Sequence, residues 1–384
     1  MDINVYEMAR LFICGDIVNG KAKEGFIGSK LASLIEDADY AIGNLEGPEL
    51  SSGLTSSCPH QVSGTINYLK LIGFDMMLLA NNHITELGAD GLKHTIQTIE
   101  VSEMDHMGAG LSWDDAYRPL VKEIAGVRFG FVNVCEAQRG FYYTKKQEFG
   151  YAWMGYENLL YDIRALSQKV DHVIVFVHTG LEHYPIPLPE VRQFYRNICD
   201  AGACVVIGGH THSPQGYDYY GDKFISYSLG NFYFPREDYS WKDENKSYSL
   251  SIVFDEKRIV EISPIFHTLS GSLVEIEDNA IQQINLNSLC EMLGDGYLKL
   301  ADNMCIDAYR NKYNKLLAYV TCGEPDDCPR IEAIKRHIAN IVFRKRTVIS
   351  TKQNRQESML LFFKNETRRD TCSRALMCLN DKTE

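Results

Sequence analysis

The sequence predicts an α/β layered domain followed, after about residue 275, by a helical C-terminal segment. Over the first 270 residues, short runs rich in Val, Ile, Phe and Leu alternate with segments of helical period. Beyond about Ile276, glycines and strand-like runs fade and helical periodicity dominates. Alternation of strands and helices is typical of sheets covered by helices, because each helix buries its apolar stripe on a sheet. We therefore expect two domains, residues 1–275 and 276–384.

The expected strands are short apolar runs that are bounded by Gly, Asn or Asp. They span residues 10–14, 40–43, 75–80, 127–134, 172–177, 204–208 and 224–228.

The expected helices lie between these runs, at residues 29–37, 65–72, 89–101, 157–168 and 190–201. In the third of them Leu92, Ile96 and Ile99 share one face, which is the spacing of an amphipathic helix. The last has Pro189 just ahead of it and Gly202 behind it, the expected start and stop signals.

The C-terminal segment is locally basic. Residues 329–374 contain 12 Lys and Arg against 4 Asp and Glu, although the whole chain has a net charge of −12. Solvated helix faces explain such a run. The alternative is a contact surface for a polyanion, for the acidic N-terminal domain or for a membrane surface, and the sequence leaves it open. An apolar stripe crosses the same segment, made of Ile331, Ile334, Ile338, Ile341 and Val342.

Composition excludes several classes of protein. The chain has 384 residues, 45% of them apolar and 23% charged, which is too apolar for a disordered protein. Its acidic balance argues against a general nucleic-acid coat, so no nucleic-acid partner is expected. No apolar run approaches the ~18 residues of an integral membrane segment. The N-terminus lacks the features of a signal peptide, so we expect a cytoplasmic location and reduced thiols among the 11 cysteines.

The most informative feature is where the polar residues fall: six polar clusters follow apolar runs. They are Asp16 in ICGD; Asn44 and Glu46 in IGNLEG; Asn81, Asn82 and His83 in LLANNH; His178 and Glu182 in VIVFVHTGLE; His210 and His212 in VVIGGHTH; and Ser228, Gly230 and Asn231 in ISYSLGNF. Ligands of open α/β sheets bind outside the carboxyl ends of the strands. We therefore expect the six clusters to converge on one edge.

The side chains of these clusters are of metal-ligand types. Carboxylates, an amide oxygen and imidazoles suit Mn²⁺, Zn²⁺, Fe or Mg²⁺ rather than soft thiophilic ions. A two-metal hydrolase needs this mixture, with one bridging carboxylate and a nearby histidine that protonates the leaving group. Taken singly, Gly-Asp and Asn-Asn-His are ordinary turn sequences. His210 and His212 would face one side together if their segment is extended.

The motifs GD, NLEGP, GFDMMLLANNH, MGAG, VHTGLEHY, GGHTHSPQG and YSLGNFYF together resemble the poly-gamma-glutamate capsule biosynthesis protein CapA family, part of the calcineurin-like metallophosphatase superfamily. The resemblance covers roughly residues 10–270, in order, and leaves the helical tail outside. It implies a four-layer α/β/β/α sandwich, to which the C-terminal helical appendage is added.

The resemblance also implies roles for single residues. Asp16 matches the first metal carboxylate, and Glu46 matches the bridging carboxylate, where the wider superfamily has Asp. Asn82 matches the amide ligand, and His83 beside it matches the catalytic acid.

Further matches come from the second half of the series. His178 and His210 match ligands of the second metal, and His212 would reach back to the first. Glu182 takes the place of the Glu in the HxGxE motif, with a role in substrate contact or in the second layer around the metal. Asn231 would shape the rim of the site.

One position departs from the superfamily. An Asp-x-His usually follows the first strand, and this sequence has Val18 in place of that histidine, as members of the capsule family commonly do. The first ion therefore loses a ligand. It could bind weakly or only together with substrate.

Three functions remain open at this point. The first is a metal-dependent hydrolase that uses one or two divalent ions to attack a phosphoester or a poly-gamma-glutamate or capsule-related polymer. The second is a non-catalytic protein that retains the fold and binds an anionic polymer or docks on the capsule-synthesis machinery. The third is a metal-free glycosidase built on Asp16 and Glu46, which leaves four strand-end histidines unexplained.

Overall fold

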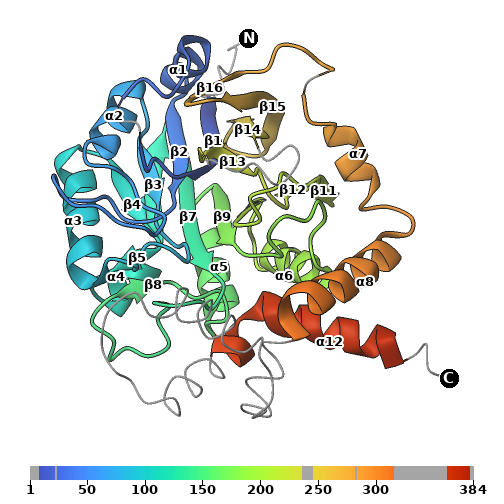
Figure 1. The fold of residues 1–384 in the computed structure, drawn as a ribbon. Coiled ribbons are helices and arrows are strands. Elements are labelled where there is room, and N and C mark those ends of the chain that lie inside the picture. Colours follow the sequence, from blue (N-terminus) through green and yellow to red (C-terminus); the bar gives the residue numbers. More distant parts are fainter. Residues whose placement is uncertain (1–7, 22–23, 236–244, 282, 315–360, 381–384) are drawn as a thin grey trace, which may run out of the picture. The chain divides into compact units, whose positions relative to one another are not determined.

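The computed structural model describes residues 8–21, 24–235, 245–281, 283–314 and 361–380 (Figure 1). The chain divides into two compact units, Met1–Ala301 and Asp302–Glu384. The first contains all strands of the described chain and is built from two large sheets. The domain boundary expected near residue 275 stays a prediction.

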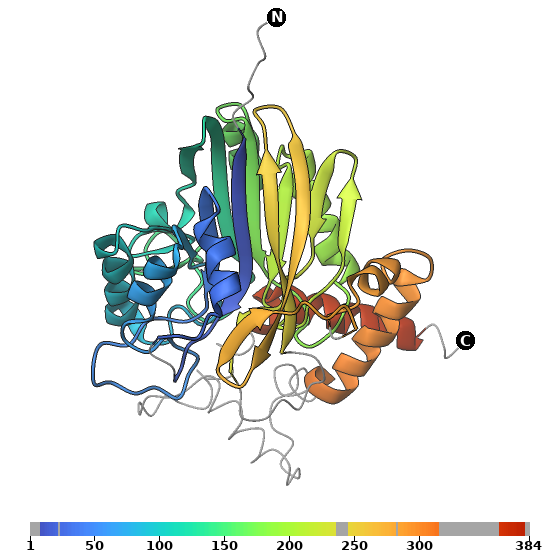
Figure 2. The same cartoon turned by 90° about the horizontal axis from the view of Figure 1, so that it is seen from above.

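The first sheet has eight strands, with β1 (Ala9–Ile17) near its centre. β1 pairs in parallel with two strands and antiparallel with β14, which lies beside it in Figure 2. The order across the sheet is β16 (Leu273–Ile276), β15 (Ile259–Ser270), β14 (Lys246–Phe254), β1, β2 (Tyr40–Leu45), β3 (Met76–Leu78) and β4 (Asp105–Met107), with β13 (Asn231–Tyr233) also paired to β1.

The second sheet has six strands, and its four central strands are parallel. Antiparallel strands form its two edges. The order is β11 (Tyr217–Tyr220), β12 (Lys223–Ser226), β10 (Val205–Gly209), β9 (His172–His178), β7 (Val127–Cys135) and β6 (Leu120–Ile124). A separate two-stranded pair joins β5 (Ala109–Gly110) to β8 (Gly150–Tyr151).

The helices of the first unit lie outside the two sheets. α1 (Ser29–Glu36), α2 (Thr65–Ile72) and α3 (Gly88–Val101) belong to the first sheet (Figure 1), and α5 (Leu159–Ser167) and α6 (Pro189–Asp200) pack on the second. The short helices α4 (Trp113–Tyr117) and α7 (Leu286–Glu291) also belong to this unit.

The second unit is helical in its described part. α8 (Tyr297–Ala308) runs into it and continues as the π-helical segment η1 (Tyr309–Tyr313), and α12 (Glu366–Asn380) follows. Within this unit Arg374 Nη1 lies 2.9 Å from Asp302 Oδ1. Part of the C-terminal segment lies outside the described residues. This part includes residues 329–360 of the basic segment with the predicted apolar stripe, and two of the 11 cysteines, Cys322 and Cys328.

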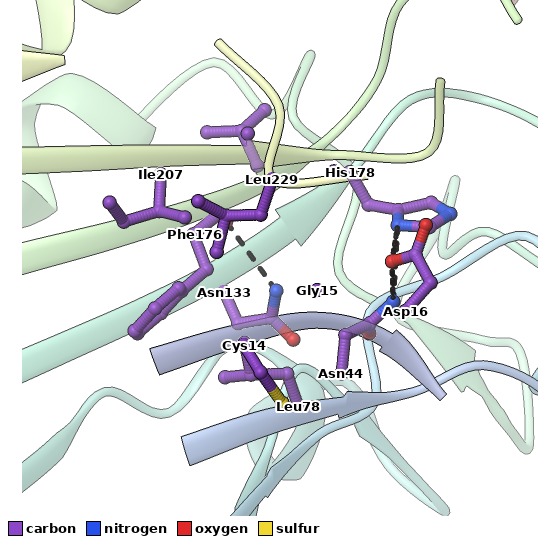
Figure 3. Close-up of a pocket in the computed structure, with 13 residues that line it drawn as sticks. Cys14, Gly15, Asp16, Asn44, Leu78, Asn133, Phe176, His178, Ile207 and Leu229 are labelled. Carbon is purple, nitrogen blue, oxygen red and sulfur yellow. Dashed lines mark hydrogen bonds and ion pairs between the residues drawn. The ribbon is translucent and has the colours of Figure 1, made fainter. Parts of the chain in front are cut away.

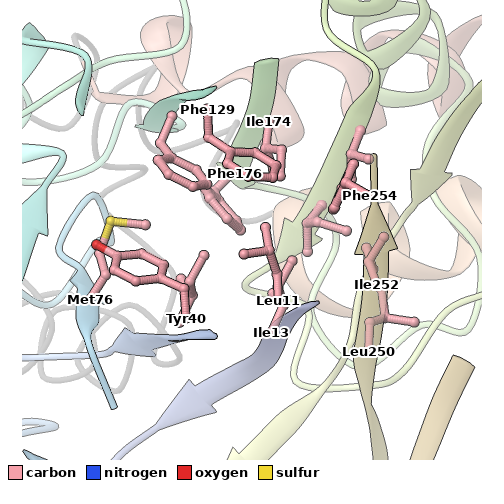
Figure 4. Close-up of a cluster of buried hydrophobic side chains, with 14 of the residues drawn as sticks. Leu11, Ile13, Tyr40, Met76, Phe129, Ile174, Phe176, Leu250, Ile252 and Phe254 are labelled. Carbon is pink, nitrogen blue, oxygen red and sulfur yellow. The ribbon is translucent and has the colours of Figure 1, made fainter. Parts of the chain in front are cut away.

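The main hydrophobic core fills the space between the two sheets (Figure 4). Leu11 and Ile13 of β1 point toward Phe129 of β7 and Phe176 of β9, and all four side chains are buried. Burial of large apolar side chains is the dominant favourable contribution to folding. Two sheets packed face to face with helices outside confirm the predicted four-layer α/β/β/α sandwich.

Nine of the 11 cysteines lie in the described part of the chain. The nine cysteines that it contains are free thiols. None of its helices combines the length and the apolar character that crossing a bilayer requires.

His267 of β15 makes the stability of the fold sensitive to acid. Its ring is buried, with Nε2 at 3.1 Å from Ser249 Oγ, and burial lowers its pKa from 6.5 to about 3. Between these two values the unfolded chain binds the proton and the folded chain does not, so stability falls as the pH falls. Replacing His267 with Gln should remove about 2 kcal/mol of the loss between pH 6.5 and about pH 5. Urea unfolding at several pH values measures this, and an unchanged pH slope would contradict it.

Candidate metal centre

The six predicted clusters meet where the carboxyl ends of the strands of both sheets come together. Strand register explains this convergence. Asp16 is paired with Asn44 on one side of β1 and with Asn231 on the other. In the second sheet, His178 at the end of β9 is paired with Gly209 of β10, so that His210 comes next in line. Each sheet therefore delivers part of one site, as expected for ligand binding at the carboxyl ends of strands.

The first group of side chains consists of Asp16, Glu46 and His212. One ligand atom from each lies within 4.8 Å of the others, and all three residues are buried. His212 Nδ1 lies 3.7 Å from Asp16 Oδ2, and its Nε2 lies 4.0 Å from Glu46 Oε1. Asn44 Nδ2 donates a hydrogen bond of 2.7 Å to Asp16 Oδ1. Two carboxylates and one imidazole in this arrangement form a donor set for a divalent ion.

The second group surrounds Nε2 of His178. Asn82 Oδ1 lies 3.0 Å from this nitrogen, and His210 Nδ1 lies 3.2 Å from it. Glu46 Oε1 is 4.0 Å from the same nitrogen. Glu46 therefore belongs to both groups, which is the position that a bridging carboxylate requires.

Burial tunes the charge of both groups. It raises the pKa of Asp16 to about 6, opposed mainly by the hydrogen bond from Asn44. Burial, reinforced by the charges of His210 and His212, holds the pKa of His178 well below its usual value. His178 is thus a neutral imidazole at pH 7, the form in which histidine binds a metal. The donor set fits a divalent ion in chemical type and in protonation.

His83 lies beside these groups. Its Nε2 is 3.7 Å from Glu46 Oε1, and its Nδ1 is 2.6 Å from Glu86 Oε1. The His83 side chain is 22% exposed, so a substrate can reach it. Burial raises the pKa of Glu86, but the hydrogen bond and charge of His83, together with Cys58 and Arg139, outweigh burial and lower this pKa. An imidazole held by a carboxylate at one nitrogen presents the other nitrogen in a fixed direction.

The loop with His210 and His212 differs from the extended segment expected from its sequence. Both residues have left-handed backbone, with φ of 82° and 58°. The turn is held by Thr211, whose hydroxyl lies 2.9 Å from Ser228 Oγ and donates to Ser213 O at 2.7 Å. His210 can therefore face His178 while His212 faces Asp16. Strained backbone of this kind is concentrated at functional sites.

Asn231 fixes the ring of His212. Nδ1 of His212 donates to Asn231 Oδ1 at 2.9 Å, which turns Nε2 toward Glu46. Such a partner on the far nitrogen sets the tautomer of a metal-binding histidine. Asn231 therefore orients a candidate ligand. This role is more specific than the predicted one of shaping the rim of the site.

The remaining predicted residues lie in the outer part of the site. Glu182 has a side chain that is 41% exposed, and its Oε1 lies 3.9 Å from His210 Nε2. Asn81 Nδ2 donates to Leu45 O at 2.9 Å, and Asn81 Oδ1 accepts from Gly47 N, so this side chain fixes the turn after β2. Gly230 N donates to Ser228 Oγ at 3.1 Å. Ser228 and Gly230 therefore stabilise the loop before β13 rather than face the ligand atoms.

Val18 is buried, and its side chain has no atom that can bind a metal ion. Its backbone N–H donates to Tyr233 O at 2.7 Å, as part of the contact between β1 and β13. The first group therefore has the three candidate ligands named above.

A small cavity lies behind the site, between the two sheets (Figure 3). Its volume is about 20 Å³, which is enough for one water molecule. Asp16, Asn44 and His178 line one end, and apolar side chains that include Phe176 and Leu229 line the other. The polar side chains of the site thus rest on an apolar floor, where electrostatic interactions are stronger than in water.

Three residues near the site were not predicted from the sequence: Glu86, Glu136 and Gln138. Glu136 is buried, with Oε1 at 3.6 Å from His210 Nε2. Gln138 Nε2 lies 3.3 Å from the same nitrogen. The sequence does contain a signal for Glu136: it comes directly after β7, just as the predicted site residues come directly after their strands.

Comparison with known proteins identifies the family. The model of a family described as bacterial capsule synthesis protein PGA_cap matches residues 10–236, which contain the whole site. The chain belongs to this family of bacterial capsule synthesis proteins.

Two curated relatives of the PGA_cap chain are both named CapA. It is 30% identical over 250 residues to capsule biosynthesis protein CapA of Bacillus anthracis, covering 59% of this chain and 60% of the relative. It is 28% identical over 234 residues to PGA biosynthesis protein CapA of Bacillus subtilis (strain 168), covering 57% of this chain and 62% of the relative. The matched part therefore spans about 60% of the length of these relatives.

Solved structures similar to the PGA_cap chain include two that are described as 5′-nucleotidases. A putative 5′-nucleotidase from Staphylococcus aureus in complex with alpha-ketoglutarate has a TM-score of 0.45 at 13% identity, covering 74% of this chain and 58% of that one. The 5′-nucleotidase from Candida albicans SC5314 has a TM-score of 0.42 at 12% identity, covering 85% of this chain and 67% of that one.

Proposed function

We propose that the chain is a metal-dependent hydrolase of the capsule synthesis family. The observation that carries the proposal is the buried group of Asp16, Glu46 and His212, whose ligand atoms lie within 4.8 Å of one another. Asp16, Glu46 and His212 would hold one divalent ion. Glu46, Asn82, His178 and His210 would hold a second. Mn²⁺, Zn²⁺, Fe or Mg²⁺ suits these donors. A bound ion of this kind supplies a water of lowered pKa and an electrophilic partner for the oxygens of the substrate.

His83 is the proposed proton donor. Glu86 holds Nδ1 of His83, so that Nε2 is directed toward the side of the site on which Glu46 lies. Protonation of the leaving group from Nε2 makes the bond easier to break. Glu182 stands at the outer edge of the site, 41% exposed, and we place it in contact with substrate.

The proposed substrate is a phosphoester or an anionic capsule-related polymer such as poly-gamma-glutamate. The printed names of the two relatives, capsule biosynthesis and PGA biosynthesis proteins, support the polymer. A metal-activated water can attack either a phosphorus atom or an acyl carbon. Release of product from a synthetic phosphoester and from purified poly-gamma-glutamate, measured side by side, distinguishes the two.

A second candidate function is binding without catalysis. It is favoured by Val18, which leaves the first group with three candidate ligands. Such a protein would hold an anionic polymer or dock on the capsule-synthesis machinery. Polymer binding by the metal-loaded chain, with no turnover of either substrate, would favour this function.

Metal content tests the hydrolase proposal directly. Elemental analysis of protein purified without chelator should find one or two equivalents of Mn, Zn or Fe. Replacing His178 or His210 with Ala should lower this content, because both rings belong to the second group. His106→Ala is the matched control, since His106 pairs with Glu100 at 3.5 Å outside the site. Absence of metal from folded wild-type protein, even after reloading, would exclude the proposed mechanism.

Glu86 should influence turnover through His83. Glu86→Gln removes the charge that holds Nδ1, and we expect turnover to fall about 10- to 100-fold while metal content is unchanged. The matched control is Glu100→Gln, which alters the Glu–His pair outside the site. Initial rates at saturating substrate measure the effect. Equal rates for Glu86→Gln and wild type would rule out an orienting role.

A further inference from the structure

Two side chains of the loop after β7 surround the outer side of the second group. Glu136 Oε1 lies 3.6 Å from His210 Nε2, the ring nitrogen that faces away from His178. Gln138 Nε2 lies 3.0 Å from Glu136 Oε1 and donates to it. Gln138 Oε1 accepts from Asn82 Nδ2 at 3.4 Å. A continuous set of contacts thus joins the outer atoms of His210 and Asn82.

The position of Glu136 is built into the second sheet. Cys135 of β7 is paired with His178 of β9, which is paired with Gly209 of β10. Glu136, Thr179 and His210 therefore follow one another across the ends of three neighbouring strands. Thr179 Oγ1 donates to Glu136 Oε2 at 2.8 Å, and Gly180 N donates to it at 3.4 Å. These bonds hold one carboxylate oxygen, while the other faces His210 and Gln138.

The two candidate ligands, His210 and Asn82, can each bind an ion in only one tautomer or orientation, and this arrangement favours that form. His210 can bind an ion through Nδ1 only when the ring proton is on Nε2. Glu136 Oε1 is the carboxylate oxygen on that side, 3.6 Å from Nε2. Gln138 Nε2 also lies 3.3 Å from this nitrogen, and it donates to Glu136 Oε1. The Asn82 amide must present Oδ1 rather than its NH₂ group, and Gln138 Oε1 engages the NH₂ group. Outer carboxylates and amides of this kind commonly tune metal sites.

We propose that Glu136 and Gln138 are positioning residues that set the tautomer of His210 and the amide orientation of Asn82 for the second ion. The inference rests on the proposed metal-dependent function and deepens it. Neither residue needs to touch substrate. Loss of either side chain should therefore weaken binding of the second ion. The affinity of the first group, Asp16, Glu46 and His212, for its ion should stay unchanged.

Calorimetric titration of the full chain with Mn²⁺, after removal of metal, tests the proposal. Glu136→Gln and Gln138→Ala should each weaken one of two binding steps about 10- to 100-fold and leave the other within about threefold. Asp75→Asn is the matched control. This carboxylate accepts from Ala41 N at 2.9 Å just ahead of β3, at the opposite end of the strand from the site. It should alter stability without changing either step.

A second readout does not depend on affinity. In protein loaded with Zn²⁺ and carrying ¹⁵N-labelled histidine, His210 should be protonated at Nε2, and that proton should exchange faster with water in Glu136→Gln. Gln138→Ala, at a half-buried residue, preserves the test if Glu136→Gln does not fold.

The outcomes separate the two proposals. Wild-type protein that takes up neither Mn²⁺ nor Zn²⁺ would overturn the proposed function and this inference with it. If wild-type protein shows two binding steps and the folded variants Glu136→Gln and Gln138→Ala bind with the same two affinities, only the inference is overturned. A selective loss of one step supports both.

Discussion

Replacing His83 with Ala is expected to lower turnover by about 10²- to 10⁴-fold, the contribution typical of a general acid. We assign no ion to His83, because its Nδ1 is engaged by Glu86 and its Nε2, 3.7 Å from Glu46 Oε1, would face the leaving group. Metal content should therefore stay at the wild-type value. Turnover number and elemental analysis on the same preparation measure both quantities.

The control for this experiment is His178→Ala, which should lose metal and activity together. If His83→Ala also loses its metal, His83 is a ligand and its assignment as proton donor is wrong. If His83→Ala keeps both metal and full turnover, the leaving group obtains its proton elsewhere.

Replacing Gly15 with Ala should destabilise the fold by at least about 3 kcal/mol. A Cβ atom at this position would lie 1.9 Å from Gly230 O, a backbone atom that cannot move without shifting the contact between β1 and β13. Asp16 N donates to the same oxygen at 3.2 Å, so the change also displaces a predicted ligand. Urea unfolding followed by circular dichroism measures the loss.

Gly20→Ala is the matched control for Gly15→Ala. A Cβ atom at Gly20 would meet His60 Cε1 at 3.9 Å, an ordinary contact, and stability should stay within about 1 kcal/mol of wild type. Equal midpoints for the two variants, with equal denaturant slopes, would show that β13 yields easily and that the close approach at Gly15 is unimportant.

The central strands could be predicted because both faces of each are covered. β9 is buried at every residue, and its sequence HVIVFVH is nearly continuous in apolar residues. β14 was missed for the opposite reason. Its sequence KSYSLSIVF alternates serine with larger residues, which suggests one face in solvent. In the structure Ser247 and Ser249 are buried too, and Ser249 contacts His267 of β15. Polar pairs across strands are invisible to a pattern based on hydrophobicity.

The site shows the same limit at the level of single side chains. Asp16, His178 and His210 could be predicted because each follows an apolar run, and strand ends of one sheet meet at one edge. Glu136 also follows such a run, but its significance depends on a contact with His210 of another loop. Glu86 gains its significance from the direction in which the turn after β3 points His83. Spacing along the chain carries neither piece of information.

The central place of β1 in its sheet has a consequence for the order in which the protein is made. β1 leaves the ribosome well before its partner β14, which spans Lys246–Phe254. A nascent chain that ends before this strand exposes one edge of β1, and unpaired edges promote association with other chains. The family match ends at residue 236, before β14, so residues 10–236 alone would leave that edge open. Productive synthesis thus depends on how quickly residues 246–254 follow, and a translational pause just upstream should increase aggregation.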